Sequence, residues 1–160
     1  ENGFIFHTAS TKDLYSQIMK NPKAKYKTMF KKAFNDMLLL DAVIFNSDRH
    51  YGNFGFLIDN KTNEIIAPAP LFDHGNSLLN FAGRDVLESA ESLEKYAKTI
   101  LPCVYDDFIG EIELTHEQRN NLRKLLDFRF TRHSRYNFDK KRLTLLEKII
   151  SNRAAEILNK

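Results

Sequence analysis

The sequence predicts a mostly helical domain with one β-hairpin. Three observations predict it. Apolar residues recur at helical spacing on both sides of the centre of the chain, two short β-prone runs at the centre are separated by a polar cluster, and prolines follow the second run. The chain has 160 residues, of which 42% are hydrophobic. This size and content predict a single globular domain over residues 1–160.

Two helices are predicted before the centre of the chain. Ser10 with Asp13 three residues later resembles a capping box, and a short apolar stripe follows before Pro22. From about Ala24 to Phe45 a second stripe continues without Gly or Pro, and its last part, "LLLDAVIF", is apolar almost all round. This second helix is therefore expected to be buried.

The pattern changes at Asn46. The runs "FGFLI" and "EIIA" are typical of two short strands, and "DNKTN" between them has the chemistry of a turn. Pro68 and Pro70 are expected to end regular pairing after the second strand. A β-hairpin is therefore predicted directly after the buried helix.

Three further helices are predicted in the second half. The first ends at Pro102, the second begins at a capping box of Thr115 with Gln118, and the third is a long C-terminal helix. The apolar positions that define these three stripes are, in order, Val86, Ala90, Leu93, Ala97 and Ile100; Leu122, Leu125 and Leu126; and Leu143, Leu146, Ile150, Ala154 and Ile157.

Composition and charge exclude several classes of protein. Lysines and arginines number 24 and aspartates and glutamates 21, and the net charge of +3 indicates no particular partner by itself. The single cysteine, Cys103, can form no internal disulfide, and no apolar run approaches the roughly 18 residues that a membrane span needs. A cytoplasmic protein without a membrane partner is expected.

The segment Phe45–Gly75, "FNSDRHYGNFGFLIDNKTNEIIAPAPLFDHG", gathers polar side chains around the predicted hairpin. Asp48 and Asn53 precede its first strand, and Asp73 follows its second. Because the second strand of a hairpin returns to the point where the first began, these three side chains are expected to converge. Two carboxylates and an amide oxygen suit Mg²⁺, which prefers oxygen ligands and keeps positions for water and substrate phosphates.

The order and spacing of these residues match those of enzymes that transfer phosphoryl groups. Protein kinases use a catalytic-loop Asp, an Asn five residues later and a metal-binding Asp that ends the next hairpin. Asp48, Asn53 and Asp73 follow that order. The glycines of the segment are expected to allow tight turns of the backbone around the metal and after it; they are Gly52, Gly55 and Gly75.

A family resemblance rests on these motifs. The stretch "NSDRHYGNFGFL" followed by "PLFDHG" resembles the C-terminal domain of HipA-type serine/threonine kinases, the toxin-like bacterial kinases. More distantly, "DRHYGN" is similar to a loop of phosphatidylinositol kinases. The resemblance is strongest over Phe45–Gly75, and it implies the C-terminal lobe of a protein-kinase-like fold, with ATP and Mg²⁺ as cofactors. It also implies that Asp48 is the catalytic base and that Asn53 and Asp73 bind the nucleotide through Mg²⁺.

The same resemblance gives roles to two neighbours of the base. His50 is implied to shape the loop, and Arg49 to support it or to contact the transferred phosphate. The loop reads D-R-H where most protein kinases have H-R-D, and the metal motif reads D-H-G where they have D-F-G. Both variants are compatible with atypical kinases, and the substrate class, protein or small molecule, stays open.

The chain is expected to be half of such a kinase. It contains no glycine-rich phosphate loop and no Lys on a credible strand, and both normally belong to the N-terminal lobe. The predicted partners are therefore the missing N-terminal kinase lobe, a protein substrate with Ser or Thr, and an antitoxin-like DNA-binding protein. No turnover is expected from this chain alone.

A metal-dependent phosphohydrolase is an alternative. Imidazole and carboxylate groups together suit Zn, Fe or Mn. Asn53 disfavours this alternative because an amide is a poor ligand for such metals. The ligands of this alternative would be Asp48, His50, Asp73 and His74.

A non-catalytic binding module for a peptide or a nucleic acid is a second alternative. The stretch Arg129–Arg142, "RFTRHSRYNFDKKR", holds six Lys or Arg residues with aromatic residues between them. The simpler interpretation is a solvated loop, because the basic residues follow no single face. That interpretation expects the aromatic side chains to pack inward; they are Phe130, Tyr136 and Phe138.

Overall fold

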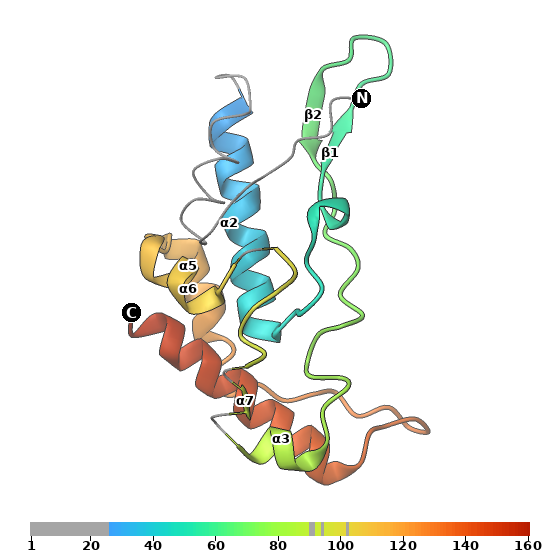
Figure 1. The fold of residues 1–160 in the computed structure, drawn as a ribbon, viewed down its shortest axis with the longest axis vertical. Helices are drawn as coiled ribbons and strands as arrows, with labels where there is room; N and C mark the ends of the chain where they lie inside the picture. Colours follow the sequence, from blue (N-terminus) through green and yellow to red (C-terminus); the bar gives the residue numbers. More distant parts are fainter. Residues whose placement is uncertain (1–25, 90–91, 94, 102) are drawn as a thin grey trace.

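A computed structural model of the chain describes residues 26–89, 92–93, 95–101 and 103–160 (Figure 1). This described part contains five α-helices and a two-stranded antiparallel sheet. The predicted mostly helical fold with one hairpin is confirmed at that level. The helix predicted between Ser10 and Pro22 lies outside the described residues. No helix among those described has the length and apolar character needed to cross a membrane.

The helices form a body around α2, and the hairpin extends from it (Figure 1). Helix α2 contacts α5, α7 and strand β2, while α3 and α6 each contact α7. The elements are α2 (Lys27–Ile44), the 3₁₀ turn η2 (Tyr51–Asn53), β1 (Phe56–Ile58), β2 (Ile65–Pro68), α3 (Arg84–Glu88), α5 (Tyr105–Glu111), α6 (His116–Arg123) and α7 (Lys140–Leu158).

Helix α2 ends where the sequence pattern changes. Phe45 adopts a left-handed backbone with φ 52°, and the N–H groups of Phe45 and Asn46 both donate to the carbonyl of Asp41. Such left-handed residues commonly end helices. Asp41 itself has no exposed surface, although it lies on an apolar face. The buried apolar residues of that face are Phe34, Met37, Leu38, Leu39, Ala42 and Val43.

The hairpin has the predicted position. Phe56 pairs with Pro68 and Leu57 with Ala67, and a bulge separates Leu57 from Ile58. Pairing thus includes Pro68, one residue beyond the predicted end. Proline is tolerated there because the Phe56–Pro68 pair lies between hydrogen-bonded positions, where no backbone donor is needed.

The apolar stripe over residues 86–100 does not form the single helix that was predicted. Helix α3 ends at Glu88, and Ser89 has an extended backbone. The Ser89 hydroxyl accepts a hydrogen bond from the N–H of Ser92 at 3.2 Å, and its carbonyl accepts one from the N–H of Leu93 at 3.1 Å. The prediction was wrong because this serine caps a new turn rather than continuing the helix.

After this turn the chain pairs with itself. Lys98 and Val104 form an antiparallel bridge, and the N–H of Tyr105 donates to the carbonyl of Ala97 at 3.0 Å. Ile100, which the stripe predicted as a core residue, is 64% exposed. The paired residues pass close to the loop that follows α2, as described below.

The last two helices agree better with the sequence. Both bonds of the predicted capping box between Thr115 and Gln118 are present at the start of α6. Helix α6 ends at Arg123, earlier than predicted, and the chain continues in turns through Leu125 and Leu126. Helix α7 buries all its predicted stripe residues, namely Leu143, Leu146, Ile150, Ala154 and Ile157.

The buried apolar side chains form two clusters. The larger one joins α2, α5, α6 and α7. The smaller one joins α7 to the segment that follows the hairpin and to α3, so it anchors the chain just beyond Asp73. Its members are Phe45, Leu79, Ala82, Leu87, Ala97, Leu146 and Ile149.

Candidate functional site

The backbone of the loop after α2 is fixed by two buried asparagines. Asn46 accepts a hydrogen bond from the N–H of Asp48 at 3.2 Å and donates to the Asp41 carboxylate at 2.9 Å. Asn53 donates its side-chain amide to the carbonyl of Asp48 at 3.1 Å. The backbone of Asp48 is thus bound by one residue before it and one residue after it in the sequence. The Asp48 side chain is half-buried.

Arg49 lies at the centre of this arrangement and has no exposed surface. Its guanidinium binds the two carboxylate oxygens of Asp41, with Nε–Oδ2 2.7 Å and Nη2–Oδ1 3.0 Å. Nη1 donates to the carbonyls of Asn53 and Phe72, and Nη2 also contacts Nε2 of His74 at 3.1 Å. A guanidinium has five N–H donors, and these five contacts use them all. Arg49 is therefore placed to support the loop, not to contact a phosphate.

The other side of the loop is held by the paired residues after α3. The carbonyl of Arg49 accepts bonds from the N–H of Leu101 at 2.9 Å and from the hydroxyl of Thr99 at 3.0 Å. The hydroxyl of Tyr105 donates to the carbonyl of Asn46. Burial raises the pKa of Tyr105 well above its ordinary value, so this hydroxyl stays a donor. Segments about 50 residues apart in sequence thus meet at this loop.

His50 makes a hydrogen bond within the loop, as expected of a residue that shapes it. Its Nδ1 accepts a hydrogen bond from the N–H of Gly52 at 3.1 Å and starts the 3₁₀ turn. A Cβ at Gly52 would lie 3.0 Å from the His50 ring, so close approach explains this glycine. No described glycine has a positive φ. Gly52 does lie in the 3₁₀ turn and Gly75 in a turn after Asp73, as predicted, but the left-handed conformations of this region occur at other residues.

Asp73 is one of those left-handed residues, with φ 59°. This conformation costs a non-glycine residue about 1–2 kcal/mol, and Asp tolerates it better than most. Its two neighbours, Phe72 and His74, both contact Arg49, which also binds the carbonyl of Asn53. The hairpin therefore returns the chain to the loop that it left, and the Asp73 side chain is exposed there.

The chain after Asp73 also reaches the loop directly. The side-chain amide of Asn76 donates to Oδ2 of Asp48 at 2.8 Å. The carbonyl of Asn76 accepts from both the N–H of Ser47, at 3.1 Å, and its hydroxyl, at 3.2 Å. Asn76 therefore fixes one oxygen of the Asp48 carboxylate, and sequence reasoning gave this residue no role.

The segment beyond Asn76 is held by α7. Leu78 and Leu79 are both left-handed, with φ 54° and 52°. Arg142 donates from Nη1 to the carbonyl of Ala82 at 2.6 Å and from Nη2 to that of Leu79 at 2.7 Å. Leu79 is fully buried, and its burial, worth about 1.5–3 kcal/mol, is large enough to offset the strain of about 1–2 kcal/mol in its own backbone.

The histidines bear on the phosphohydrolase alternative. Because a guanidinium can only donate, Nε2 of His74 is the acceptor in its contact with Arg49. The 3.8 Å approach of the same nitrogen to Asp41 is therefore no ion pair in this arrangement. A metal at this nitrogen would have to displace a buried cation, which disfavours His74 as a ligand.

Sequence reasoning missed three residues that build the site. Asp41 pairs with Arg49, Asn76 orients Asp48, and Arg142 holds the following segment. A signal existed only for Asp41, since a lone carboxylate within "LLLDAVIF" must find a buried partner. The other two act through contacts across 28 and about 60 residues of sequence, which no local pattern reveals.

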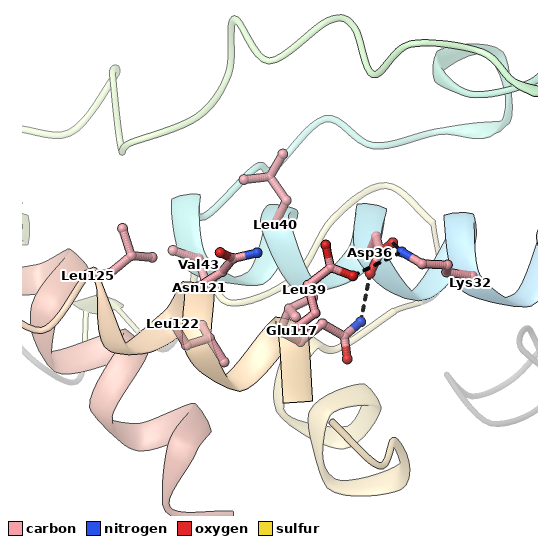
Figure 2. A pocket seen from close by; sticks show the side chains of 10 residues that line it. Lys32, Asp36, Leu39, Leu40, Val43, Glu117, Asn121, Leu122 and Leu125 are labelled. Atoms are coloured by element: carbon pink, nitrogen blue, oxygen red, sulfur yellow. Dashed lines mark hydrogen bonds and ion pairs between the residues drawn. The ribbon is translucent and has the colours of Figure 1, made fainter. Parts of the chain in front are cut away.

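A separate groove lies between α2 and α6 (Figure 2). Its floor is apolar and includes Leu39 and Leu122. The charged groups on its rim bind one another, since Asp36 accepts from Lys32 at 2.7 Å and from Gln118 at 2.7 Å. None of the predicted site residues lines this groove.

A scan against protein-family models and searches of curated proteins and of solved structures gave no match for this chain.

Proposed function

We propose that the chain is the C-terminal catalytic lobe of an ATP- and Mg²⁺-dependent serine/threonine kinase of the HipA-like type. In the complete protein it would transfer the γ-phosphoryl group of ATP to a Ser or Thr hydroxyl. The observation that carries the proposal is the position of Arg49. Its guanidinium joins the segment of Asp48 and Asn53 to the residues on either side of Asp73.

The donor set suits a hydrated Mg²⁺ beside phosphates. Asn53 uses its amide nitrogen to bind the carbonyl of Asp48, so its oxygen is the atom that would face a cation. Asp73 offers an exposed carboxylate on a backbone held by its neighbours. Asn53 and Asp73 would hold the metal, whose charge neutralises the phosphates when it is bound.

Asp48 would accept or orient the proton of the substrate hydroxyl. One of its carboxylate oxygens is bound by Asn76, which leaves the second oxygen for the substrate. A carboxylate held by a neutral donor keeps its orientation without losing its charge, and orientation is what a base in phosphoryl transfer must supply. His50 and Arg49 would act by shaping and supporting the loop, as their contacts indicate.

Exposed apolar side chains on the hairpin support a partner lobe. Leu57, Ile58 and Ile66 are 48%, 53% and 62% exposed. Neighbouring exposed apolar side chains on a short hairpin indicate a surface that another unit covers. An N-terminal lobe carrying the phosphate loop and the Lys is the unit that the proposed reaction requires.

The test compares the complete protein with its Asp73→Asn variant. We expect Asp73→Asn to abolish phosphate transfer from ATP to Ser- and Thr-containing peptides and to weaken Mg²⁺-dependent nucleotide binding measured by calorimetry. Asp107→Asn, a matched change of an exposed carboxylate on α5, should leave both unchanged. Wild-type transfer rates in Asp73→Asn would contradict the proposal, and binding of Zn²⁺ or Mn²⁺ alone would favour the phosphohydrolase. The 160-residue chain alone should show no turnover until the missing lobe is added in trans.

A further inference from the structure

The segment of residues 129–142, which comprises part of the connection from α6 and the first turn of α7, is organised by one histidine; we call it the basic-aromatic loop. Nδ1 of His133 accepts bonds from the N–H groups of Arg135 and Tyr136, both at 3.1 Å. The N–H of His133 donates to the side chain of Asn137 at 2.9 Å, and the Asn137 amide donates back to the carbonyl of His133. The loop extends from the helical body with a defined shape (Figure 1).

Two of the three Phe and Tyr side chains of this loop face solvent. Tyr136 is 78% exposed and Phe138 is 62% exposed, so the expectation that they pack inward is wrong for both. The Tyr136 ring stacks on the His133 ring, with centroids 5.5 Å apart and planes 23° apart. Only Phe130 packs inward, edge to face with Phe128. The hydrogen bonds to His133 hold the His133 and Tyr136 rings outward. Their apolar surface therefore stays exposed to water and does not stabilise the core.

An open cavity of about 490 Å³ lies in the loop. Eight residues line it, of which four carry planar rings and only Leu143 is aliphatic. The cavity combines ring side chains with hydrogen-bonding groups, which is the chemistry that unpaired nucleobases fit.

The charge of the loop favours an anionic ligand. Asp139 is its only acidic residue, and its carboxylate accepts from the first N–H groups of α7. Arg132 pairs with Glu147 at 2.9 Å. The Arg142 guanidinium donates to the carbonyls of Leu79 and Ala82, as described above. The other four basic side chains of the loop have no acidic partner among the described residues; they are Arg129, which donates to the carbonyl of Phe128, and Arg135, Lys140 and Lys141.

We infer that the basic-aromatic loop binds single-stranded nucleic acid. Bases stack on Tyr136 and Phe138, and Arg135 with the two lysines contacts the backbone phosphates. An acidic polypeptide would use the charges but not the ring faces, and a duplex keeps its bases stacked on one another. The inference does not rest on the proposed kinase activity.

The experiment measures binding of a fluorescent oligothymidine or oligouridine of about ten nucleotides to the 160-residue chain by anisotropy, over a range of salt concentrations. Tyr136→Ala and Phe138→Ala should each weaken binding about tenfold, while Tyr136→Phe should retain it. Replacing Lys140 and Lys141 together with Gln should reduce the slope of log K against log salt by about 1–1.5. Ile66→Ala, which removes an equally exposed apolar side chain from the hairpin, should change neither quantity.

Several results would overturn the inference. One is the absence of salt-dependent binding to either oligonucleotide. Another is competition by a polyglutamate peptide of equal charge as effectively as by the unlabelled oligonucleotide, which would identify a surface for acidic polypeptides. Tighter binding of a duplex of the same length, or unchanged binding by both alanine variants with native circular dichroism, would also exclude base stacking as the mode of recognition.

Discussion

Arg49 and Asp41 form a two-point ion pair in which neither side chain is exposed to solvent. Removing two charges from water costs several kcal/mol per ion, and the pair offsets that cost only if every remaining donor is also satisfied. In this structure all donors of Arg49 have acceptors, and three of those acceptors belong to the candidate site. The pair therefore fixes the geometry of the site to the core of α2.

The first prediction concerns this pair. Arg49→Ala should lower the free energy of unfolding by about 3–5 kcal/mol, because it leaves the Asp41 carboxylate buried without a partner. Arg49→Lys should recover little, since an ammonium has three donors and no planar fork. Urea unfolding followed by circular dichroism measures both. Arg84→Ala, at an exposed arginine, is the matched control, and a loss below about 1 kcal/mol for Arg49→Ala would contradict the buried pair.

The second prediction concerns Asn76 and Asp48. In the complete protein, Asn76→Ala should lower kcat about tenfold with a smaller change in KM, because the Asp48 carboxylate loses the donor that orients it. Asn76→Asp should be worse, since it places a second negative charge against Asp48. Steady-state kinetics separate the two effects, with Asn60→Ala in the hairpin turn as the control. A tenfold rise of KM with an unchanged kcat would show that Asn76 acts on substrate binding and not on Asp48.

Much of the fold could be predicted because its signals are local. Helix α2, the hairpin and α7 follow from hydrophobic periodicity and turn residues, and the Thr115–Gln118 capping box from two side chains. The stripe before Pro102 was misread for an equally local reason. Ser89 interrupts the helix with its own hydrogen bonds, and periodicity alone gives that serine no weight.

The residues of the candidate site also divide into those with a local sequence signal and those without one. The spacing of Asp48, Asn53 and Asp73 predicts that their segments meet, because a hairpin links sequence separation to spatial return, and Arg49 does join these segments. Asn76 and Arg142 were not found, because their partners lie far away in sequence. The exposed rings of Tyr136 and Phe138 were also not predicted. Their orientation depends on the bonds that His133 makes within the loop, and composition does not contain that information.

The third prediction separates backbone strain from chemistry at Asp73. Asp73→Ala should destabilise the chain by about 1 kcal/mol, because Ala tolerates a φ of 59° poorly, whereas Asp73→Gly should be close to neutral for stability. Both variants should lose metal-dependent phosphate transfer in the complete protein. Thermal unfolding and nucleotide binding measure the two effects, and equal stability of the two variants would mean that Asp73 is not left-handed in solution.

The fourth prediction concerns pH. Burial alone would raise the pKa of Asp106, but hydrogen bonds from Lys160 and Arg153 outweigh it and hold the pKa below its ordinary 3.8. A carboxylate with a lowered pKa contributes stability above its unfolded pKa and loses that contribution as pH falls through the folded value. Asp106→Asn should therefore lower the free energy of unfolding at pH about 7, and the difference from the native chain should shrink below pH about 4. A difference that is constant across this range would contradict a charged role for Asp106.

The last prediction concerns the clamp that Arg142 makes on the segment after Asn76. Leu78 and Leu79 each store about 1–2 kcal/mol of backbone strain, and the two bonds from Arg142 hold the carbonyls of Leu79 and Ala82 against α7. Without these bonds the segment can relax toward ordinary backbone angles.

Arg142→Met keeps the length and the apolar part of the side chain but removes the donors. It should raise amide hydrogen exchange of residues 76–83 while α7 stays protected, because only the segment loses partners. Lys141→Met, at the neighbouring exposed position, is the control. Because Asn76 begins this segment, the same variant should lower kcat of the complete protein in the manner of Asn76→Ala. Faster exchange with an unchanged kcat would show that the strained segment is held by α7 for stability and does not position Asp48.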